Sequence, residues 1–275
     1  MKITRDEVIK ANQAVHSQLA AVYNTNEPHF REENVLKVTK NLKTISDKYI
    51  SPKLLDIGCG TGFIIDIAKN LFTEVHGIDA TEEMIDKVKV DTDNITLHHG
   101  IAEELPFKDN EFDVVTAYSF IHHLYNYTDV LKEVNRVLKP GGTFYIDLEP
   151  NKLFWDAIKD LKLDNKYSDI VGKEIDSVIA TGKQLNEKYG IDPEDFDKAE
   201  YHKNIVGGID PERFLLDLKE AGFSESNYEF AWFLGEGQYV HNEKEEVYEA
   251  VNYYLQKVAP LSAHLYKYVK FVSVK

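Results

Sequence analysis

Cysteine, positive charge and long apolar segments are scarce in this chain. Its single cysteine, Cys59, excludes a disulfide within the chain and is typical of a reducing compartment, so we expect a cytoplasmic protein. No segment approaches the run of about 18 apolar residues that a membrane-spanning helix requires. The charged start, MKITRDEVIK, lacks the apolar stretch of an export signal. The sequence therefore predicts neither a membrane protein nor an exported one.

The charge balance is acidic. The 275 residues include 32 Lys and Arg against 47 Asp and Glu, which gives a formal net charge of −15. Proteins that bind nucleic acid neutralise its phosphates with a basic surface, and no basic cluster stands out in this sequence. We therefore expect a small-molecule partner and no nucleic acid. Nothing in the sequence indicates an oligomeric state.

Residues 1–50 have the pattern of amphipathic helices. A helix is predicted over residues 6–23, where apolar side chains recur every three or four positions: Val8, Ala11, Val15, Leu19 and Val22. Turn-forming residues from Asn24 to Pro28 end it. A second helix is predicted over residues 31–48. We interpret residues 1–50 as a helical cap.

Between residues 51 and 150, short apolar runs alternate with helical patterns. Strands are predicted over 53–57, 75–78, 95–98, 112–118 and 143–148, and helices over 62–71, 82–90 and 128–138. The last of these helices should stop at Pro140-Gly141-Gly142. This alternation is typical of an α/β fold, a Rossmann-like doubly wound sheet with helices on both faces.

The alternation stops after Pro150 and resumes near residue 210. There an Asp N-cap, followed by a proline at the first helical position, begins a helix over 210–221. Strands are predicted over 228–234 and 268–274, the last of them antiparallel to the mostly parallel sheet. We interpret 51–150 as the cofactor-binding core and 209–275 as the rest of the sheet. Helical insertions at 151–208 and about 235–266 would form lids over its ligand end.

The segment LLDIGCGTG at residues 54–62 carries the strongest functional signal. Glycines at positions 58, 60 and 62 follow a predicted strand and open a predicted helix. Glycine allows a tight turn and a close approach of a ligand to the main chain. The free N–H groups of the helix that follows favour an anionic group such as a carboxylate. The segment therefore predicts a ligand-binding loop.

Two acidic residues narrow the class of ligand. Asp79 ends the second predicted strand, where a carboxylate can accept both hydroxyls of a ribose. NAD-binding domains share such an acid, but their loop reads G-x-G-x-x-G, whereas this one reads G-x-G-x-G. Asp56, just before the loop, would repel a pyrophosphate and attract an ammonium or sulfonium group. Together these features favour a cationic ligand.

The stretch LLDIGCGTGF at 54–63 resembles the first motif of class I S-adenosylmethionine-dependent methyltransferases. Similar stretches follow in that family's order: GID at 77–79, GIAEELPF at 100–107, FDVV at 112–115, RVLKPGG at 136–142 and EAGF at 220–223. The resemblance covers 50–150, 210–234 and 268–275, and is strongest to the small-molecule branch that includes quinone-biosynthesis methyltransferases. It implies S-adenosylmethionine as cofactor, S-adenosylhomocysteine as product and a small-molecule methyl acceptor beneath the 151–208 lid.

The resemblance also implies a set of cofactor-binding residues. They are Tyr23, Asp56, Gly58, Cys59, Gly60, Asp79, Ala80, Met84, Ile101, Ala102, Tyr118 and Ser119. Asp56 would lie near the amino group of the methionine part and Asp79 at the ribose. The family usually has an acidic residue where this chain has Ile101. The adenine amino group must then be held by backbone groups, by Glu103 or by packing.

Methyl transfer from a sulfonium requires alignment and exclusion of water, and a base only where the acceptor must lose a proton. His122 and His123 follow the fourth predicted strand and are the candidate catalytic bases. Consecutive residues in a turn diverge, so at most one should face the pocket, and both could simply pack. Glu149 is a second candidate base, an acceptor anchor or a solvated loop charge. Cys59 is expected to pack, and no spacing of His, Cys and Asp predicts a metal site.

Three functions from different classes fit these observations. The first is a methyltransferase acting on a small metabolite. The second is an NAD-binding oxidoreductase, which the loop spacing disfavours. The third is a non-catalytic module that binds S-adenosylmethionine. Competition between NAD and S-adenosylhomocysteine separates the second from the other two, and methylation of a protein acceptor has no positive support in the sequence.

Overall fold

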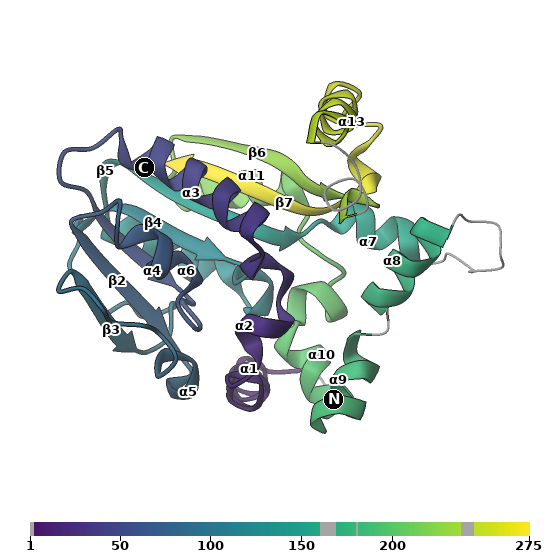
Figure 1. The fold of residues 1–275 in the computed structure, drawn as a ribbon. Helices are drawn as coiled ribbons and strands as arrows, with labels where there is room; N and C mark the ends of the chain where they lie inside the picture. The colour runs from purple at the N-terminus through teal and green to yellow at the C-terminus, as the bar shows by residue number, and fades with distance from the viewer. Residues whose placement is uncertain (1–2, 160–168, 180, 238–244) are drawn as a thin grey trace.

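A mixed β-sheet organises the part of the chain that the computed structural model describes, residues 3–159, 169–179, 181–237 and 245–275 (Figure 1). Its seven strands lie in the order β3-β2-β1-β4-β5-β7-β6. Their bounds are β1 Lys53–Ile57, β2 Glu74–Asp79, β3 Ile95–His99, β4 Phe112–Tyr118, β5 Leu138–Pro150, β6 Glu225–Phe233 and β7 Tyr266–Val274.

Most of the sheet is parallel. β1 pairs in parallel with β2 and β4, β2 with β3, and β4 with β5. β7 lies between β5 and β6 and is antiparallel to both. The predicted fold class, including the antiparallel last strand, is confirmed. Because the chain runs outward from β1 to β3 and then returns to β4, ligands are expected outside the carboxyl ends of β1 and β4.

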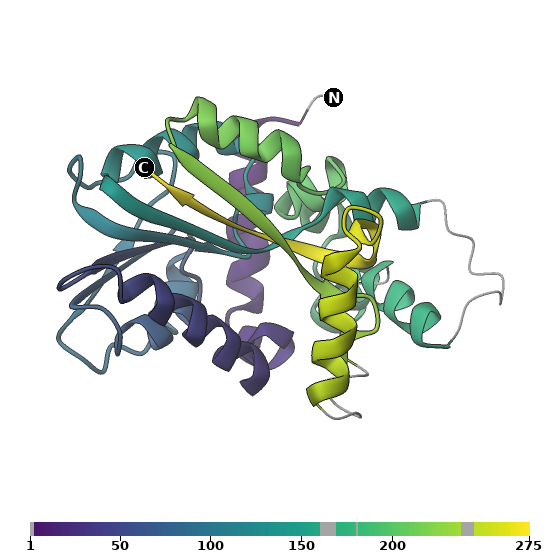
Figure 2. The same cartoon turned by 90° about the horizontal axis from the view of Figure 1, so that it is seen from above.

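Helices cover both faces of the sheet (Figure 2). Their bounds are α1 Arg5–Leu19, α2 Tyr23–Asn26, α3 Glu32–Ser46, α4 Phe63–Ala68, α5 Glu82–Ile85, α6 Tyr127–Val137 and α11 Pro211–Glu220, with the 3₁₀ turns η1 Pro28–Phe30 and η2 Ile121–His123. Successive side chains of a strand point to opposite faces. Leu55 and Ile57 of β1 therefore join the core under α6 and α11, while Leu54 joins the core under α3 and α4.

Two helical segments interrupt the sheet. The one between β5 and α11 contains α7 Lys152–Lys159, α8 Asp169–Ile179, α9 Thr181–Tyr189, α10 Pro193–Ala199 and the π-helical turn η3 Tyr201–Ile205. The one between β6 and β7 contains α13 Glu245–Lys257 and the 3₁₀ turn η4 Ala263–Leu265. The two ends of the first segment are joined, because the Ile209 N–H donates to Pro150 O at 2.7 Å and the Lys152 N–H donates to Ile209 O at 3.0 Å.

Helix α1 packs against this first segment. Thr4 and Glu7 form a capping box that fixes the start of the helix. The residues buried along α1 are those of the predicted stripe, Val8, Ala11, Val15 and Leu19. The last three form one apolar cluster with Phe196 and Ala199 of α10. Figure 1 shows α1 beside α10, with α5 on its other side. None of the described helices is both long and apolar enough to cross a bilayer.

Several predicted helices are longer than the observed ones, and two of them end four or five residues earlier than predicted. The first ends at Leu19, because Val22 leaves the helical backbone region (φ −120°, ψ −2°), and Tyr23 begins the separate helix α2. The helix predicted over 82–90 ends at Ile85. Val88 beyond it packs so closely on Gly62 that a Cβ there would lie 2.9 Å from Val88 Cγ1. Tertiary contacts with the glycine loop therefore replace the predicted last turns.

Strand β5 begins earlier than predicted. It starts at Leu138 and runs through the glycine pair that was expected to separate helix from strand. The Gly141 N–H donates to Lys275 O, and the Lys275 N–H donates to Gly142 O, both at 3.0 Å. These bonds to the end of β7 hold the glycine pair in the sheet, and the sequence near residue 140 contains no sign of them.

Helix α11 joins the first insertion to the sheet, and its two faces give a matched test of the core. Phe214 is fully buried with its ring 4.5 Å from that of Phe271 in β7, whereas Leu216 is 54% exposed. We expect Phe214→Ala to lower the free energy of unfolding by about 3–5 kcal/mol. Leu216→Ala should change it by no more than about 0.5 kcal/mol. Urea denaturation measures both, and equal losses would contradict this packing.

Candidate functional site

A pocket opens at the carboxyl ends of β1, β2 and β4, with α1 along one side. Every residue predicted to bind the cofactor lines it: Tyr23, Asp56, Gly58, Cys59, Gly60, Asp79, Ala80, Met84, Ile101, Ala102, Tyr118 and Ser119. Of the two predicted catalytic histidines, His123 lines the pocket and His122 does not. The structure thus brings the predicted cofactor residues together from five separate segments.

The glycine loop is held from two sides. Gly58 has φ +65°, and a Cβ on it would lie 2.0 Å from the ring of Phe120, the second residue after β4. The Gly60 N–H donates to Asp79 Oδ2 at 2.8 Å, which fastens the loop to the end of β2. Only glycine allows both the positive φ and the close ring contact at position 58.

The Asp79 carboxylate is bonded to the backbone on both sides. Oδ2 accepts the Gly60 N–H and Oδ1 accepts the Thr81 N–H, each at 2.8 Å. An ionised carboxylate has about four lone-pair positions, so each oxygen can still accept a further hydrogen bond. Beyond Asp79 the pocket wall is apolar, with Met84 and Ala102 buried beside Ile101. This side of the pocket can hold a polar ring by its hydroxyls and a flat ring by packing.

Asp56 is a buried carboxyl group beneath the loop. It is 2% exposed, and burial raises its pKa to about 8. The Thr116 hydroxyl donates to Asp56 Oδ1 at 2.7 Å and lowers the pKa, while the charge of Asp79 raises it. A positive group beside Asp56 would stabilise its ionised form. The chemistry at this end of the pocket therefore suits a cation.

Aromatic side chains close the pocket near α2 and η1. The rings of Tyr23, Phe30 and Phe63 surround His29, with centroid distances between 4.6 and 6.0 Å. His29 is 3% exposed, and burial lowers its pKa to about 4, so its ring is neutral at pH 7. Sequence reasoning did not select His29, because it lies in a turn where helical periodicity carries no information. Its position between Pro28 and Phe30 was the available signal.

Glu149 controls the turn that carries the two histidines. It is fully buried at the end of β5, so it is not the solvated loop charge that the sequence allowed. Its Oε1 accepts the backbone N–H groups of Phe120 and Ile121, both at 2.9 Å. Its Oε2 accepts the backbone N–H of His122 at 3.0 Å and is 2.9 Å from His122 Nδ1. This carboxylate therefore fixes the shape of η2.

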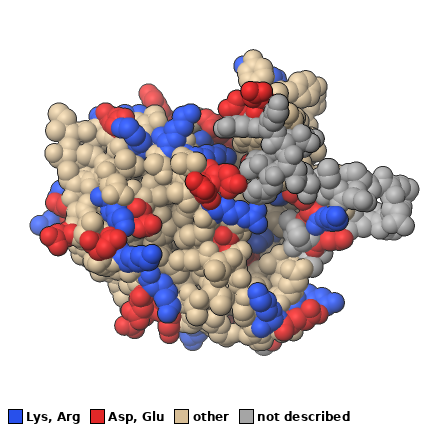
Figure 3. Space-filling model, in the orientation of Figure 1, with Lys and Arg blue, Asp and Glu red and all other residues tan. Residues whose placement is uncertain are grey.

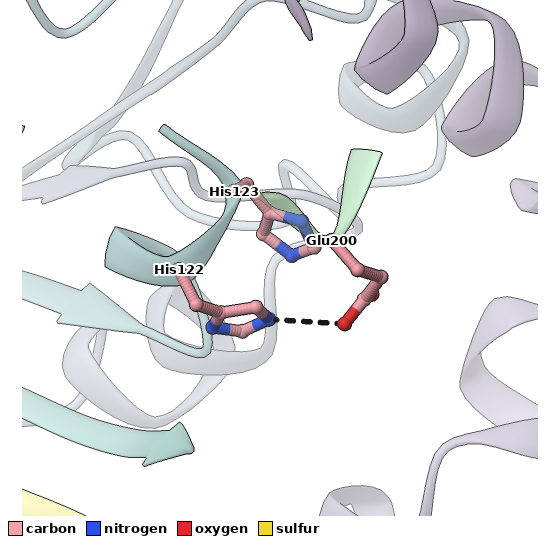
Figure 4. Close-up of side chains that lie close together, drawn as sticks. All are labelled: His122, His123 and Glu200. Atoms are coloured by element: carbon pink, nitrogen blue, oxygen red, sulfur yellow. Dashed lines mark ion pairs between the residues drawn. The ribbon is translucent and has the colours of Figure 1, made fainter. Parts of the chain in front are cut away.

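The two histidines contact different groups, but both contact the end of α10 or the residue that follows it. His123 Nδ1 lies 2.7 Å from Ala199 O, the last residue of α10. His122 Nε2 lies 3.6 Å from the carboxylate of Glu200 (Figure 4). Burial lowers the pKa of His123 well below its usual range, and the neighbouring His122 lowers it further. The pair thus links the end of β4 to the end of α10.

Sequence reasoning missed a partly buried ion pair beside the histidines. The Lys203 ammonium is 2.8 Å from Glu200 Oε2. Burial raises the pKa of Glu200, but the charge of Lys203 and of the two imidazoles outweighs it and lowers this pKa. Burial also raises the pKa of Glu27 to about 7. These residues come from segments with no recognisable motif, and only the packing of α10 on α1 brings them to the core.

Part of the chain matches a family of known proteins. Residues 55–146 match the family model described as a methyltransferase domain. Demethylmenaquinone methyltransferase of Staphylococcus aureus (strain MRSA252) is 47% identical over 96 residues, which are 33% of this chain and 40% of that protein. The chain thus matches less than half the length of these relatives. The resemblance seen in the sequence is confirmed for this segment, which is a methyltransferase domain.

Solved structures resemble the chain over most of its length. The [4+2]-cyclase SpnF has a TM-score of 0.59 against this chain, with 15% identity and 96% of each chain covered. Phosphoethanolamine N-methyltransferase 2 of Haemonchus contortus, solved with phosphomonomethylethanolamine and S-adenosylhomocysteine, has a TM-score of 0.57 and 17% identity. That match covers 100% of this chain and 60% of the other. At these identities the likeness concerns the fold, and proteins with different names share it.

The hydrogen bonds of Glu149 give the first test of the site. Glu149→Gln replaces one accepting oxygen by an NH₂ group, so at least one buried backbone N–H loses its partner. We expect the free energy of unfolding to fall by about 1–3 kcal/mol. The exposed Glu82→Gln should change it by no more than about 0.5 kcal/mol. Urea denaturation of both variants checks this, and an unchanged Glu149→Gln protein would refute the structural role.

The raised pKa of Asp56 gives a second test through pH. The folded state holds this proton more tightly than the unfolded chain, with a pKa of about 8 against the ordinary value of 3.8 for an aspartate side chain. This contribution to stability is complete below the unfolded value and is lost as pH rises through about 8. Between about pH 5 and about pH 9 the wild type should therefore lose more stability than Asp56→Asn. Urea denaturation at both pH values measures this, with the exposed Asp93→Asn as a control that should follow the wild type.

Proposed function

We propose that this chain is an S-adenosylmethionine-dependent methyltransferase that transfers a methyl group to a small-molecule acceptor by in-line displacement. The observation that carries the proposal is Asp56, a buried carboxyl group beneath the glycine loop of a methyltransferase domain, with its pKa raised to about 8. A ligand with a positive charge restores the ionised form of this group, whereas a pyrophosphate would oppose it. The site therefore favours S-adenosylmethionine over NAD.

The residues of the pocket fit this cofactor. Asp56 would face its amino group, and the free acceptor positions of Asp79 would take the ribose hydroxyls. Met84, Ile101 and Ala102 would hold the adenine ring by packing. Each of these residues lines the same pocket, and the buried position of Asp56 supports its assignment to the cationic part of the cofactor, because a positive charge beside it would stabilise its ionised form.

Where Ile101 departs from the family pattern, we propose that packing holds the adenine. Glu103 lines the pocket but lies 3.4 Å from Arg5 Nε of α1, so its carboxylate already has a charged partner. We therefore assign no adenine hydrogen bond to Glu103. Apolar contact with Ile101 and its neighbours is the assigned means of holding the adenine.

The protein's share of the reaction is alignment and exclusion of water. The bound cofactor supplies a methyl group on a positively charged sulfur, which is already an activated electrophile. Correct alignment of the acceptor with it contributes roughly 7–11 kcal/mol to lowering the barrier. Tyr23, Phe30 and Tyr118 supply an apolar wall at the end of the pocket that carries Asp56. Such a wall keeps water from competing with the acceptor.

The segments outside the matched domain would select the acceptor. We assign residues 1–50 as a cap, 151–208 as the acceptor lid and about 235–266 as a second insertion in the remaining sheet, 209–275. The apolar cluster between α1 and α10 supports this assignment, because it joins residues 151–208 to a helix that lines the pocket. Lids of this kind complete a site when they close.

The histidine pair is proposed to act on the proton that some methyl acceptors must lose. His123 lies in the pocket wall, and both rings point an imidazole nitrogen toward Glu200 of the lid. For an acceptor that must lose a proton before methylation, we propose that His122 and His123 promote that loss. For an acceptor that is already a free nucleophile, the pair has no proton to handle.

The acceptor is a small molecule, and the charge of the protein supports this class. The net charge is −15, and on the face shown in Figure 3 the Lys and Arg side chains are interspersed with Asp and Glu. A nucleic acid would require a continuous basic surface. The relative from Staphylococcus is named for demethylmenaquinone, but the match covers only 33% of this chain and 40% of that protein, so the acceptor is not carried over. The single cysteine supports a cytoplasmic location.

A protein that binds the cofactor without transferring its methyl group is the second candidate. The observation in its favour is that SpnF, named as a [4+2]-cyclase, shares the fold. Fold alone therefore does not require methyl transfer. Binding of S-adenosylhomocysteine together with methyl-donor consumption separates the two candidates.

Calorimetric titration with S-adenosylhomocysteine, with NAD in a parallel run, tests the cofactor. We expect micromolar binding of S-adenosylhomocysteine and no binding of NAD. Asp79→Ala should weaken binding by about 1.5–3 kcal/mol for each charge-assisted hydrogen bond lost. Asp79→Asn keeps one accepting oxygen and should lose less. Absence of S-adenosylhomocysteine binding to the wild-type protein would overturn the proposed function. Wild-type affinity in Asp79→Ala would overturn the ribose assignment.

A further inference from the structure

Three side chains from two distant segments converge where the lid meets the core. His122 and His123 lie in η2 after β4, and Glu200 follows the last residue of α10. One nitrogen from each ring and one carboxylate oxygen lie within 4.8 Å of one another. Figure 4 shows the two rings and the carboxylate around a common space.

The hydrogen bonds of both rings fix which nitrogen can act as a ligand. His122 Nδ1 is 2.9 Å from Glu149 Oε2, and His123 Nδ1 is 2.7 Å from Ala199 O. Carboxylate and carbonyl oxygens accept hydrogen bonds, so each Nδ1 carries a hydrogen, and the Nε2 of each ring is the nitrogen that can offer a lone pair to a metal ion. Metal-binding histidines are oriented by the same outer partners, a carboxylate or a backbone carbonyl on the other ring nitrogen.

In this arrangement the Nε2 atoms of the two rings and the carboxylate of Glu200, all able to accept a hydrogen bond, face one another. His122 Nε2 lies 3.6 Å from Glu200 Oε2, too far for a hydrogen bond. Within the described residues, neither Nε2 has a hydrogen-bond partner. Lys203 contacts Glu200 Oε2 and offsets one negative charge, which leaves the second carboxylate oxygen free. Glu149 adds a buried negative charge behind His122, so the group still favours a cation.

We propose that His122, His123 and Glu200 form a binding site for a divalent transition-metal ion, of which Zn²⁺ is the expected example. Two imidazole nitrogens and one carboxylate are a donor set that Zn²⁺ takes with a position left open for a further ligand. Ligand atoms around a tetrahedral Zn²⁺ lie roughly 3.4 Å apart, so the side chains need to close only slightly. The spacing of these residues in the sequence contains no metal motif, which is why none was predicted there.

The position of the site indicates its role. Two of its ligands belong to the core and one belongs to the lid, so a bound ion would tie the lid to the carboxyl end of β4. His123 also lines the pocket, which leaves that side of the ion open to a ligand from the pocket. The site stands on this geometry alone and does not depend on methyl transfer.

Metal titration of the full chain tests the proposal without any activity assay. After dialysis against a chelator, calorimetry with ZnCl₂ should show one tight equivalent per chain, and Co²⁺ should give the strong visible absorption of a four-coordinate site. Glu200→Gln should weaken Zn²⁺ binding by more than the roughly 10–100-fold that loss of an outer partner costs. His99→Gln, which changes an exposed histidine outside the site, should bind as the wild type does.

The outcomes are decisive in both directions. Loss of the tight equivalent in Glu200→Gln and in His123→Gln, with His99→Gln unchanged, supports the site. Equal affinity in all four proteins would place the ion elsewhere and overturn the proposal. If a variant fails to fold by circular dichroism, the Co²⁺ spectrum of the wild type still decides, because the weak absorption of a hydrated ion would overturn the site.

Discussion

The Glu149 carboxylate is the interaction on which the functional end of this molecule depends. It is buried at the end of β5 and collects the backbone N–H groups of three consecutive residues after β4. A turn held in this way has one shape, because its buried backbone N–H groups need acceptors and the Glu149 carboxylate supplies them. That shape sets the ring of Phe120 against Gly58 and directs His123 to the pocket wall. Both the glycine loop and the histidine pair therefore contact a turn whose shape depends on one buried carboxylate.

Charged groups gather in two places. At the glycine loop, burial raises the cost of charging Asp56, and the charge of Asp79 adds to that cost. Beside the end of α10, opposite charges partly offset among His122, His123, Glu200 and Lys203, of which His123 lines the pocket. A cationic ligand would stabilise the ionised form of Asp56. The second group concerns a bound cation or the proton of a methyl acceptor.

The matched and unmatched parts of the chain divide the function in the same way. The methyltransferase domain, residues 55–146, contains the glycine loop, Asp79, β4 and the histidine turn. Residues 1–50 and 151–208 lie outside it. Helix α1 lines the pocket and also packs against α10. Proteins with the same fold are named for cyclisation and for N-methylation, so the shared sheet does not fix the reaction. The segments outside residues 55–146 are the ones proposed to select the acceptor.

The sequence by itself determined the sheet, its order of elements and the cofactor end of the pocket. These depend on local signals, such as the apolar runs of β1 and β4, the glycines from 58 to 62 and the acid that ends β2, and each signal lies within about ten residues. Tertiary structure alone decided the start of β5, the burial of Glu149 and the approach of Glu200 to the histidines. Glu200 reaches His122 because α10 packs on α1, and such a contact depends on the shape of whole helices. Local periodicity fixes which side of a helix is buried, but not which distant side chains meet beyond its end.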